Sequence, residues 1–322
     1  MFQSFFLNRK WFLWSIIGSI FLISSTWGKV KIDVIINKWF GSFYNLLQKA
    51  LTKPNSVTIN EYFEQIMIFV KYAGIYVIVV IVVEFFTRHY VFRWRQAMNE
   101  YYTKNWFKLR HIEGAAQRLQ EDTMRFARIV ETLGIEFIRS ILTLIAFIPL
   151  LFELGKNITK YPFFGEVTNG LVYLAIISAL VGTVFLAIIG VKLPMLEFHN
   201  QRVEAAFRKE LVYGEDNESR AEVLKLSQLF GDVRKNYFKL YFHYLYFDLA
   251  KWSYLQFSVM IPYIALAPTV IVGTITFGIM QQIVRAFNRV EASFQLLVYS
   301  WSTIIELMSI YKRLKLFENQ MK

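Results

Sequence analysis

Four glutamates have a residue type and spacing suited to proton exchange: Glu121, Glu131, Glu204 and Glu215. On an ideal α-helix, Glu204 and Glu215 lie within about 20° of one face, whereas Glu121 and Glu131 diverge by about 80°. Inside a cavity, desolvation and mutual repulsion favour the protonated carboxyl, so such groups would exchange protons near physiological pH. On a surface they would be ordinary solvated acids, and their spacing alone favours that reading.

A second polar pattern runs along the segment 270–300. Gln281, Arg285, Asn288 and Gln295 follow an i, i+4, i+7, i+14 spacing among neighbours that are mostly Phe, Ile, Val and Leu. One polar stripe on an otherwise apolar helix indicates either the wall of an aqueous cavity or a polar seam between helices. We favour the cavity wall.

The sequence lacks the motifs of most other kinds of catalytic or binding site. Zero cysteines exclude disulfides, thiolate catalysis and Cys-ligated metal centres. The chain has no phosphate-binding P-loop motif, no H-E-x-x-H, no G-x-S-x-G and no G-x-G-x-x-G. Four histidines, at the ends of the apolar stretches, are better explained as structural than as metal ligands. We therefore expect neither an enzyme nor a metal or organic cofactor.

The composition describes the scaffold that would hold these residues. Of 322 residues, 55% are hydrophobic and 19% are charged, with a mean hydropathy of +0.36. Too few polar residues remain to cover a soluble globule, and disorder requires far lower hydrophobicity. The net charge of +12 is sometimes a sign of nucleic-acid binding, but the long apolar runs do not suit a soluble binder. The composition predicts an all-α integral membrane protein without a nucleic-acid partner.

Hydropathy and length predict six spans in one transmembrane domain covering 1–322, with no nucleotide-binding domain. They are 11–28, 62–88, 130–154, 168–192, 238–264 and 270–300. A signal peptide is the rival reading of the first span, but no A-x-A cleavage site follows it, which favours a retained anchor.

Basic residues predict the orientation. The segments 88–128 and 192–239 carry nine Lys or Arg each, and the loops between the other spans are poorer in them. The positive-inside rule places both segments and both termini in the cytoplasm. Both segments are rich in helix formers, so the membrane helices should continue in pairs far beyond the bilayer. Small cytoplasmic helical hairpins are the alternative.

Several long motifs resemble the SbmA/BacA family. They include His89-Tyr-Val-Phe-Arg-Trp-Arg, Gln120-Glu-Asp-Thr-Met, Val203-Glu-Ala-Ala, Tyr213-Gly-Glu-Asp and Glu306-Leu-Met-Ser-Ile-Tyr-Lys-Arg-Leu. The likeness covers about residues 30–318 and departs at the start, where longer members carry additional spans.

The resemblance implies a fold and a function. Members of that family are bacterial inner-membrane importers of peptides, antimicrobial peptides among them. They work as homodimers driven by the proton gradient, and their six helices resemble an ABC exporter without its ATPase. The resemblance also implies a role for four glutamates, which would line the central cavity and couple transport to protons: Glu121, Glu131, Glu204 and Glu215. No cofactor beyond the coupling proton is expected.

Two other classes of function stay open. The chain would be the membrane subunit of an ATP-driven transporter if a separate ATPase bound near 114–122, which resembles the short helix that such subunits offer their ATPases. A role in envelope lipid composition is the third class, and no motif supports it.

Overall fold

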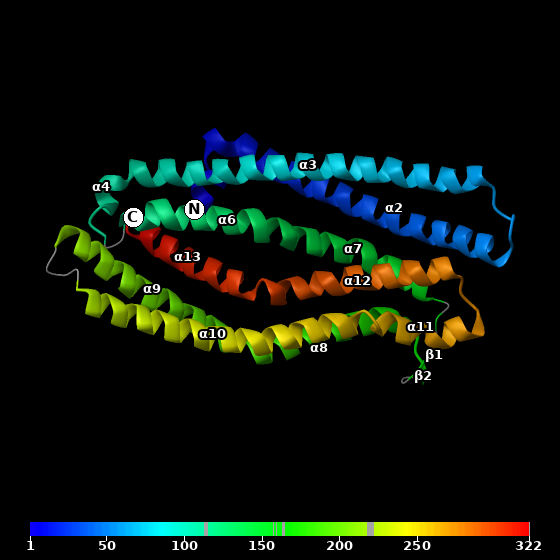
Figure 1. Cartoon of the computed structure of the whole chain (residues 1–322). Coiled ribbons are helices and arrows are strands. Elements are labelled where there is room, and N and C mark those ends of the chain that lie inside the picture. Colours follow the sequence, from blue (N-terminus) through cyan, green and yellow to red (C-terminus); the bar gives the residue numbers. More distant parts are fainter. Residues whose placement is uncertain (113–114, 157, 159, 163–164, 218–221, 322) are drawn as a thin grey trace. The chain divides into compact units, whose positions relative to one another are not determined.

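The computed structural model describes residues 1–112, 115–156, 158, 160–162, 165–217 and 222–321 (Figure 1). They are almost entirely helical, which confirms the expected all-α class. Two packing units can be distinguished. The first comprises Met1–Ile177 with Pro262–Lys322, and the second comprises Ser178–Ile261. Two basic residues counted above, Arg220 and Lys322, lie outside the described residues. The single transmembrane domain stays a prediction.

The elements follow one another with few connecting residues. Up to the hairpin they are α1 (Phe2–Phe6), η1 (Arg9–Trp11), η2 (Leu13–Ile17), α2 (Gly18–Thr52), α3 (Ile59–Lys104), α4 (Trp106–Leu109), α5 (Ala115–Gln117), η3 (Arg118–Asp122), α6 (Thr123–Ile129), η4 (Val130–Gly134) and α7 (Ile135–Gly155). An antiparallel pair, β1 (Lys160–Tyr161) and β2 (Gly165–Glu166), precedes α8 (Gly170–Gly190), α9 (Leu193–Asp216), α10 (Val223–Ser258), α11 (Ile261–Val272), α12 (Phe277–Tyr299) and α13 (Trp301–Asn319). The segment η1 is a 3₁₀-helix, and η2, η3 and η4 are π-helical.

Five helical stretches of the described residues are long and apolar enough to cross a membrane. They are Leu13–Thr52, Ile59–Lys104, Ala115–Gly155, Gly170–Gly190 and Val223–Val272. Each overlaps one of the first five predicted spans. The predicted sixth span, 270–300, contains a turn before α12, and α12 is not among the five. That span therefore rests on the sequence pattern alone.

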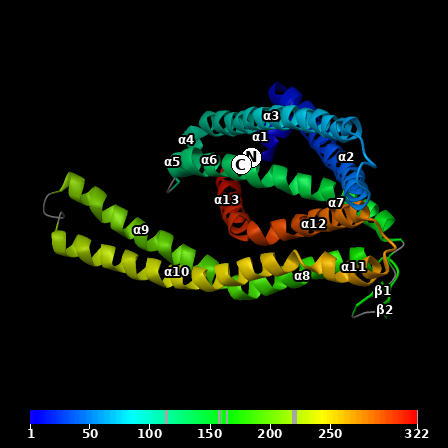
Figure 2. The ribbon, with the colours of Figure 1, turned by 45° about the vertical axis from the view of Figure 1, so that its right-hand side comes forward.

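Several helices run well past the predicted spans. At 1.5 Å per residue, the 46 residues of α3 measure about 69 Å, roughly twice the hydrocarbon thickness of a bilayer. The helices α9 and α10 lie side by side as an antiparallel pair (Figure 2). These lengths confirm the predicted helical extensions. The first span also differs, because α2 continues to Thr52 through a segment expected to be a loop.

Local signals explain where the helices begin and end. The side chain of Thr58 accepts a hydrogen bond from the backbone N–H of Glu61, and Glu61 accepts one from the backbone of Thr58. This capping box starts α3. Gly273, with a φ of 73°, makes the turn between α11 and α12, in a conformation that glycine adopts without strain.

A large cluster of buried residues in the first unit joins α1, α3, α6 and α13. Its fully buried side chains include Phe5, Met98, Tyr102, Leu109 and Phe317. The Tyr102 hydroxyl donates to the Glu318 carboxylate at 3.0 Å, and burial raises the pKa of Tyr102. This cluster fixes α13 against α6 and so positions the polar groups described next.

Candidate functional site

Glu121 lies in η3, where its carboxylate contacts Gln117 and Arg125. Its carboxylate is 2.7 Å from Nη2 of Arg125 and accepts a hydrogen bond from Gln117 at 3.0 Å. The same Arg125 reaches Glu306 of α13 at 3.3 Å through Nη1. About a third of the Glu121 side chain is exposed, so solvent can reach the carboxylate. Arg125 therefore stands between carboxylates of two helices.

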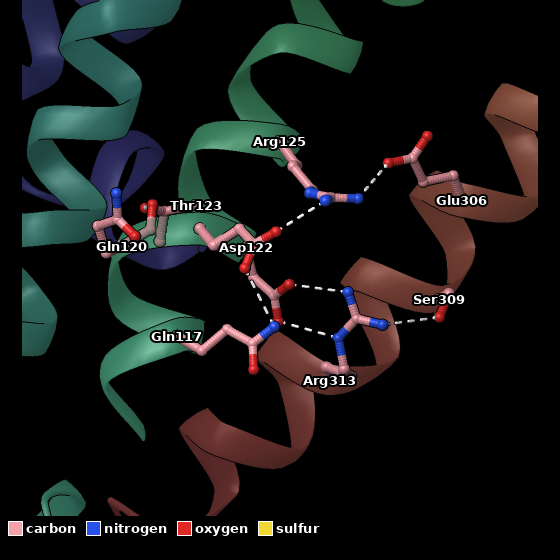
Figure 3. Close-up of polar contacts among 9 residues, drawn as sticks. Gln117, Gln120, Asp122, Thr123, Arg125, Glu306, Ser309 and Arg313 are labelled. Carbon is pink, nitrogen blue, oxygen red and sulfur yellow. Dashed lines mark hydrogen bonds and ion pairs between the residues drawn. The ribbon is translucent and has the colours of Figure 1, made fainter. Parts of the chain in front are cut away.

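A second ion pair beside it holds the two helices together. Arg313 of α13 donates to both carboxylate oxygens of Asp122, at 2.9 Å from Nε and 2.7 Å from Nη2 (Figure 3). The Asp122 side chain is only 4% exposed, and its carboxylate raises the pKa of Arg313. Two parallel hydrogen bonds fix the orientation of both groups. Sequence reasoning missed this pair, although Asp122 lies inside a quoted motif and Arg313 in another.

Glu131 lies in the next π-helical segment, η4. Its nearest cation is Arg88 of α3, with 4.0 Å between Nε and Oε1, and Arg88 lies at a similar distance from Glu84. Glu121 and Glu131 thus both lie in π-helical turns and beside arginines. Such turns are rare and often occur at functional sites. They also change the rotation per residue, so the 80° estimate for an ideal α-helix does not apply across them.

The other two predicted glutamates lie on α9 in the second unit. The helix is regular from Leu193 to Asp216, so the estimated 20° between Glu204 and Glu215 holds. Glu204 is half-buried and Glu215 is exposed. Between them, the buried carboxylate of Glu210 pairs with Lys225 of α10 at 2.7 Å, a contact that sequence reasoning also missed. Glu121 and Glu131 thus belong to the first unit, and Glu204 and Glu215 belong to the second.

The four side chains of the polar stripe on α12 differ in how far they are buried. Asn288 is exposed, Gln281 is half-buried and Gln295 is 6% exposed. The Arg285 guanidinium lies 3.7 Å from the ring centroid of Phe40 on α2, and its Nε is buried without a hydrogen-bond partner in the described part of the chain. The role of these four residues as a cavity wall stays a prediction.

A neighbouring row on α12 forms a polar seam with α2. Asp33 pairs with Arg289 at 3.3 Å, and the Gln282 amide donates to the Lys38 carbonyl at 3.1 Å. The Asn45 side chain accepts a hydrogen bond from the backbone N–H of Gly278 at 3.0 Å. Gly278 lies so close to α2 that an added Cβ would meet the backbone of α2. The helices therefore pack at very short range.

Asp33 and Arg289 were not predicted, although both interrupt apolar sequence. Ionisable side chains in membrane segments are costly and usually face protein, so each is a functional candidate by default. Among the described residues, no group of three His, Cys, Asp or Glu side chains is placed to hold a metal ion.

Comparisons with known proteins identify the family of this chain. Residues 8–322 match the family model described as the SbmA/BacA-like family. The chain is 25% identical over 322 residues to the inner membrane ABC transporter ATP-binding protein YddA of Escherichia coli, covering 93% of this chain and 56% of that protein.

Two further relatives have similar names. An uncharacterized ABC transporter ATP-binding protein of Synechocystis is 28% identical over 69% of this chain and 34% of its own length. The chloroplastic ABC transporter D family member 2 of Arabidopsis thaliana is 27% identical over 70% of this chain and 33% of its own length. The chain spans between about a third and about half of these relatives.

Proposed function

The chain belongs to the SbmA/BacA-like family of membrane transporters, and on that premise we propose that it imports peptides, antimicrobial peptides included, using the proton gradient. The transporter works as a homodimer in the bacterial inner membrane, with both termini in the cytoplasm. Protons are the only coupling ion, and Glu121, Glu131, Glu204 and Glu215 carry them.

The position of Arg125 between two carboxylates supports proton coupling. While Glu121 is ionised, Arg125 is held by Glu121 at 2.7 Å and by Glu306 at 3.3 Å. Protonation removes the charge of Glu121, so Glu306 remains as the only ionised carboxylate of the two that pair with Arg125. The Asp122–Arg313 pair still ties the same turn to α13, so protonation shifts Arg125 toward Glu306 of α13 without releasing the turn. Protonation of Glu121 thus changes how Arg125 is shared between the carboxylates of two helices.

Alternating access then requires a cargo that binds the two states differently. In a cavity lined by carboxylates, each protonation step removes one negative charge facing the peptide, so the protonated and ionised states bind it with different affinities. Outside, protons load the glutamates and the cavity accepts peptide. Inside, the more alkaline cytoplasm removes the protons. The observation that carries this proposal is that both predicted glutamates of the first unit lie in π-helical turns beside arginines.

Uptake in liposomes tests the proposal. Purified protein should take up a labelled cationic peptide only when a pH gradient is imposed, and replacement of all four glutamates by Gln should abolish the response. The control is Glu166→Gln in the exposed β-hairpin, which should transport normally. Unchanged uptake by the fourfold variant would sink the proposal.

The second candidate is a membrane subunit of an ATP-driven transporter. The printed names of the relatives include ATP-binding proteins, and each is longer than the stretch it shares with this chain. In that case an ATPase should co-purify in stoichiometric amount, and uptake should require ATP rather than a pH gradient. Uptake by the purified chain alone, without nucleotide, would exclude this candidate.

A further inference from the structure

A polar contact joins α9 to α10 within the second unit. The hydroxyl of Tyr244 on α10 donates a hydrogen bond to the carboxylate of Glu197 on α9, with 2.8 Å between Oη and Oε1. About one turn further along α9, the Asn236 side-chain amide donates to the side-chain oxygen of Asn200 at 3.3 Å. The carboxylate of Glu197 is therefore oriented by a donor from the neighbouring helix.

Apolar packing holds Tyr244 in place for this contact. Leu193 and Leu196 of α9 form a buried cluster with Leu240 of α10, and Tyr244 packs against it. The ring of Tyr244 thus belongs to an apolar contact, whereas its hydroxyl reaches a polar partner, as is usual for a partly buried tyrosine. Glu197 is half-buried, so protons from solvent can still reach its carboxylate.

Glu197 extends the row of glutamates on α9. The helix is regular from Leu193 to Asp216. Glu197 and Glu215 are 18 residues apart, which is about five full turns, and Glu204 lies within about 20° of the same line. The row measures about 27 Å along the helix axis. Glu197 is its member nearest to the predicted span 168–192.

The neighbouring helix supplies an ionisable group inside a predicted span. Asp248 follows Tyr244 by one turn of α10, so the two side chains are neighbours on one face of that helix. Both belong to the predicted span 238–264, and Asp248 is half-buried. Ionisable side chains in membrane segments are costly and usually serve a function. Tyr244 therefore has two carboxylates as neighbours, Asp248 on its own helix and Glu197 on α9.

We propose that Glu197 is a further proton-binding carboxylate of the transport cycle and that Tyr244 positions it. Glu197 binds one proton, while the Tyr244 hydroxyl keeps its own proton and remains hydrogen-bonded to Glu197 in both states. The other titratable groups on the same faces are Asp248 and Lys251 of α10 and Glu204 of α9. This inference rests on the proposed function and extends its proton-carrying row to the membrane end of α9.

Infrared difference spectroscopy of the full chain in liposomes tests proton binding without peptide and without a pH gradient. As the pH falls, protonated carboxyl groups appear through their carbonyl stretch, and Glu197→Gln should remove one such contribution. The new amide oxygen can still accept from Tyr244, so the variant should fold. Tyr244→Phe removes a donor that favours the ionised carboxylate, so protonation should occur about one pH unit higher. In the Glu197→Gln background, Tyr244→Phe should cause no shift.

Uptake in liposomes tests whether that proton is coupled to transport. The peptide gradient that just balances an imposed pH gradient gives the number of protons moved per peptide. Glu197→Gln should lower this number, whereas Asp232→Asn, which removes an exposed carboxylate of α10, is the matched control and should leave it unchanged.

The outcomes separate this inference from the proposed function. An unchanged carbonyl signal in Glu197→Gln would overturn proton binding by Glu197. A normal number of protons per peptide in Glu197→Gln would overturn this inference alone and leave the Tyr244 contact as a purely structural one. Wild-type uptake that ignores the pH gradient would overturn the proposed function and this inference together.

Discussion

Asp33 of α2 and Arg289 of α12 form an ion pair with 3.3 Å between Oδ1 and Nη2, although 256 residues separate them in the chain. Only a tenth of the Asp33 side chain is exposed, against 40% of Arg289. Lys29 precedes Asp33 by one turn of α2. The pair ties α2 to α12.

Asp33→Asn should destabilise the protein, because it leaves the Arg289 charge without its carboxylate. Breaking a fully buried pair costs about 3–5 kcal/mol, and the exposure of Arg289 reduces this to about 1–2 kcal/mol. Thermal unfolding in detergent measures the change. Glu166→Gln, which breaks the exposed Lys160–Glu166 pair, should have almost no effect. Equal melting temperatures for both variants would contradict the prediction.

Arg313→Lys should weaken the contact between η3 and α13 even though the charge is kept. A lysine ammonium cannot make the two parallel hydrogen bonds that Arg313 makes to Asp122. We expect a loss of about 1–2 kcal/mol. In a double-mutant cycle with Asp122→Asn, the two changes should be clearly non-additive. Additive losses would show that the two side chains act independently.

Glu121→Gln and Glu306→Gln should affect uptake in different ways, although both remove a partner of Arg125. If Glu121 carries a coupling proton, its replacement makes the remaining uptake insensitive to the pH gradient. Glu306→Gln leaves the Glu121–Arg125 pair, so uptake should slow but keep its gradient dependence. Initial rates across a series of imposed gradients distinguish the two. A loss of gradient dependence in Glu306→Gln alone would reverse the assigned roles.

Gly278→Ala should lower the melting temperature, because the new Cβ would collide with the backbone of Gly41 on α2. Overpacking of this kind typically costs about 1–3 kcal/mol. Gly74→Ala within α3 is the matched control. No atom lies within 4 Å of its added Cβ, and alanine is the better helix former by about 1 kcal/mol. Gly74→Ala should therefore leave the melting temperature unchanged or raise it. If it lowered the melting temperature as much as Gly278→Ala does, the close packing of α12 against α2 would not explain the effect.

The predicted spans and the observed helices agree best where the sequence is continuously apolar. The predicted span 168–192 is the helix Gly170–Gly190 with almost the same bounds. The bounds of α2 were missed, because Lys29, Lys31 and Asp33 interrupt its apolar pattern. In the structure, Asp33 is paired and Lys31 lies over the Trp27 ring, so these charges do not end the helix. Partners on the same or another helix override the local hydropathy signal.

The amino-acid sequence by itself determined the helical membrane class, the long extensions and the family, because hydropathy, helix propensity and motifs are local properties of the chain. It also singled out Glu121 and Glu131. Only the tertiary structure decided that both lie in π-helical turns, and that Asp122 pairs with Arg313 from 191 residues away. Such pairs depend on which distant helices pack together, and no local pattern in the chain specifies that choice.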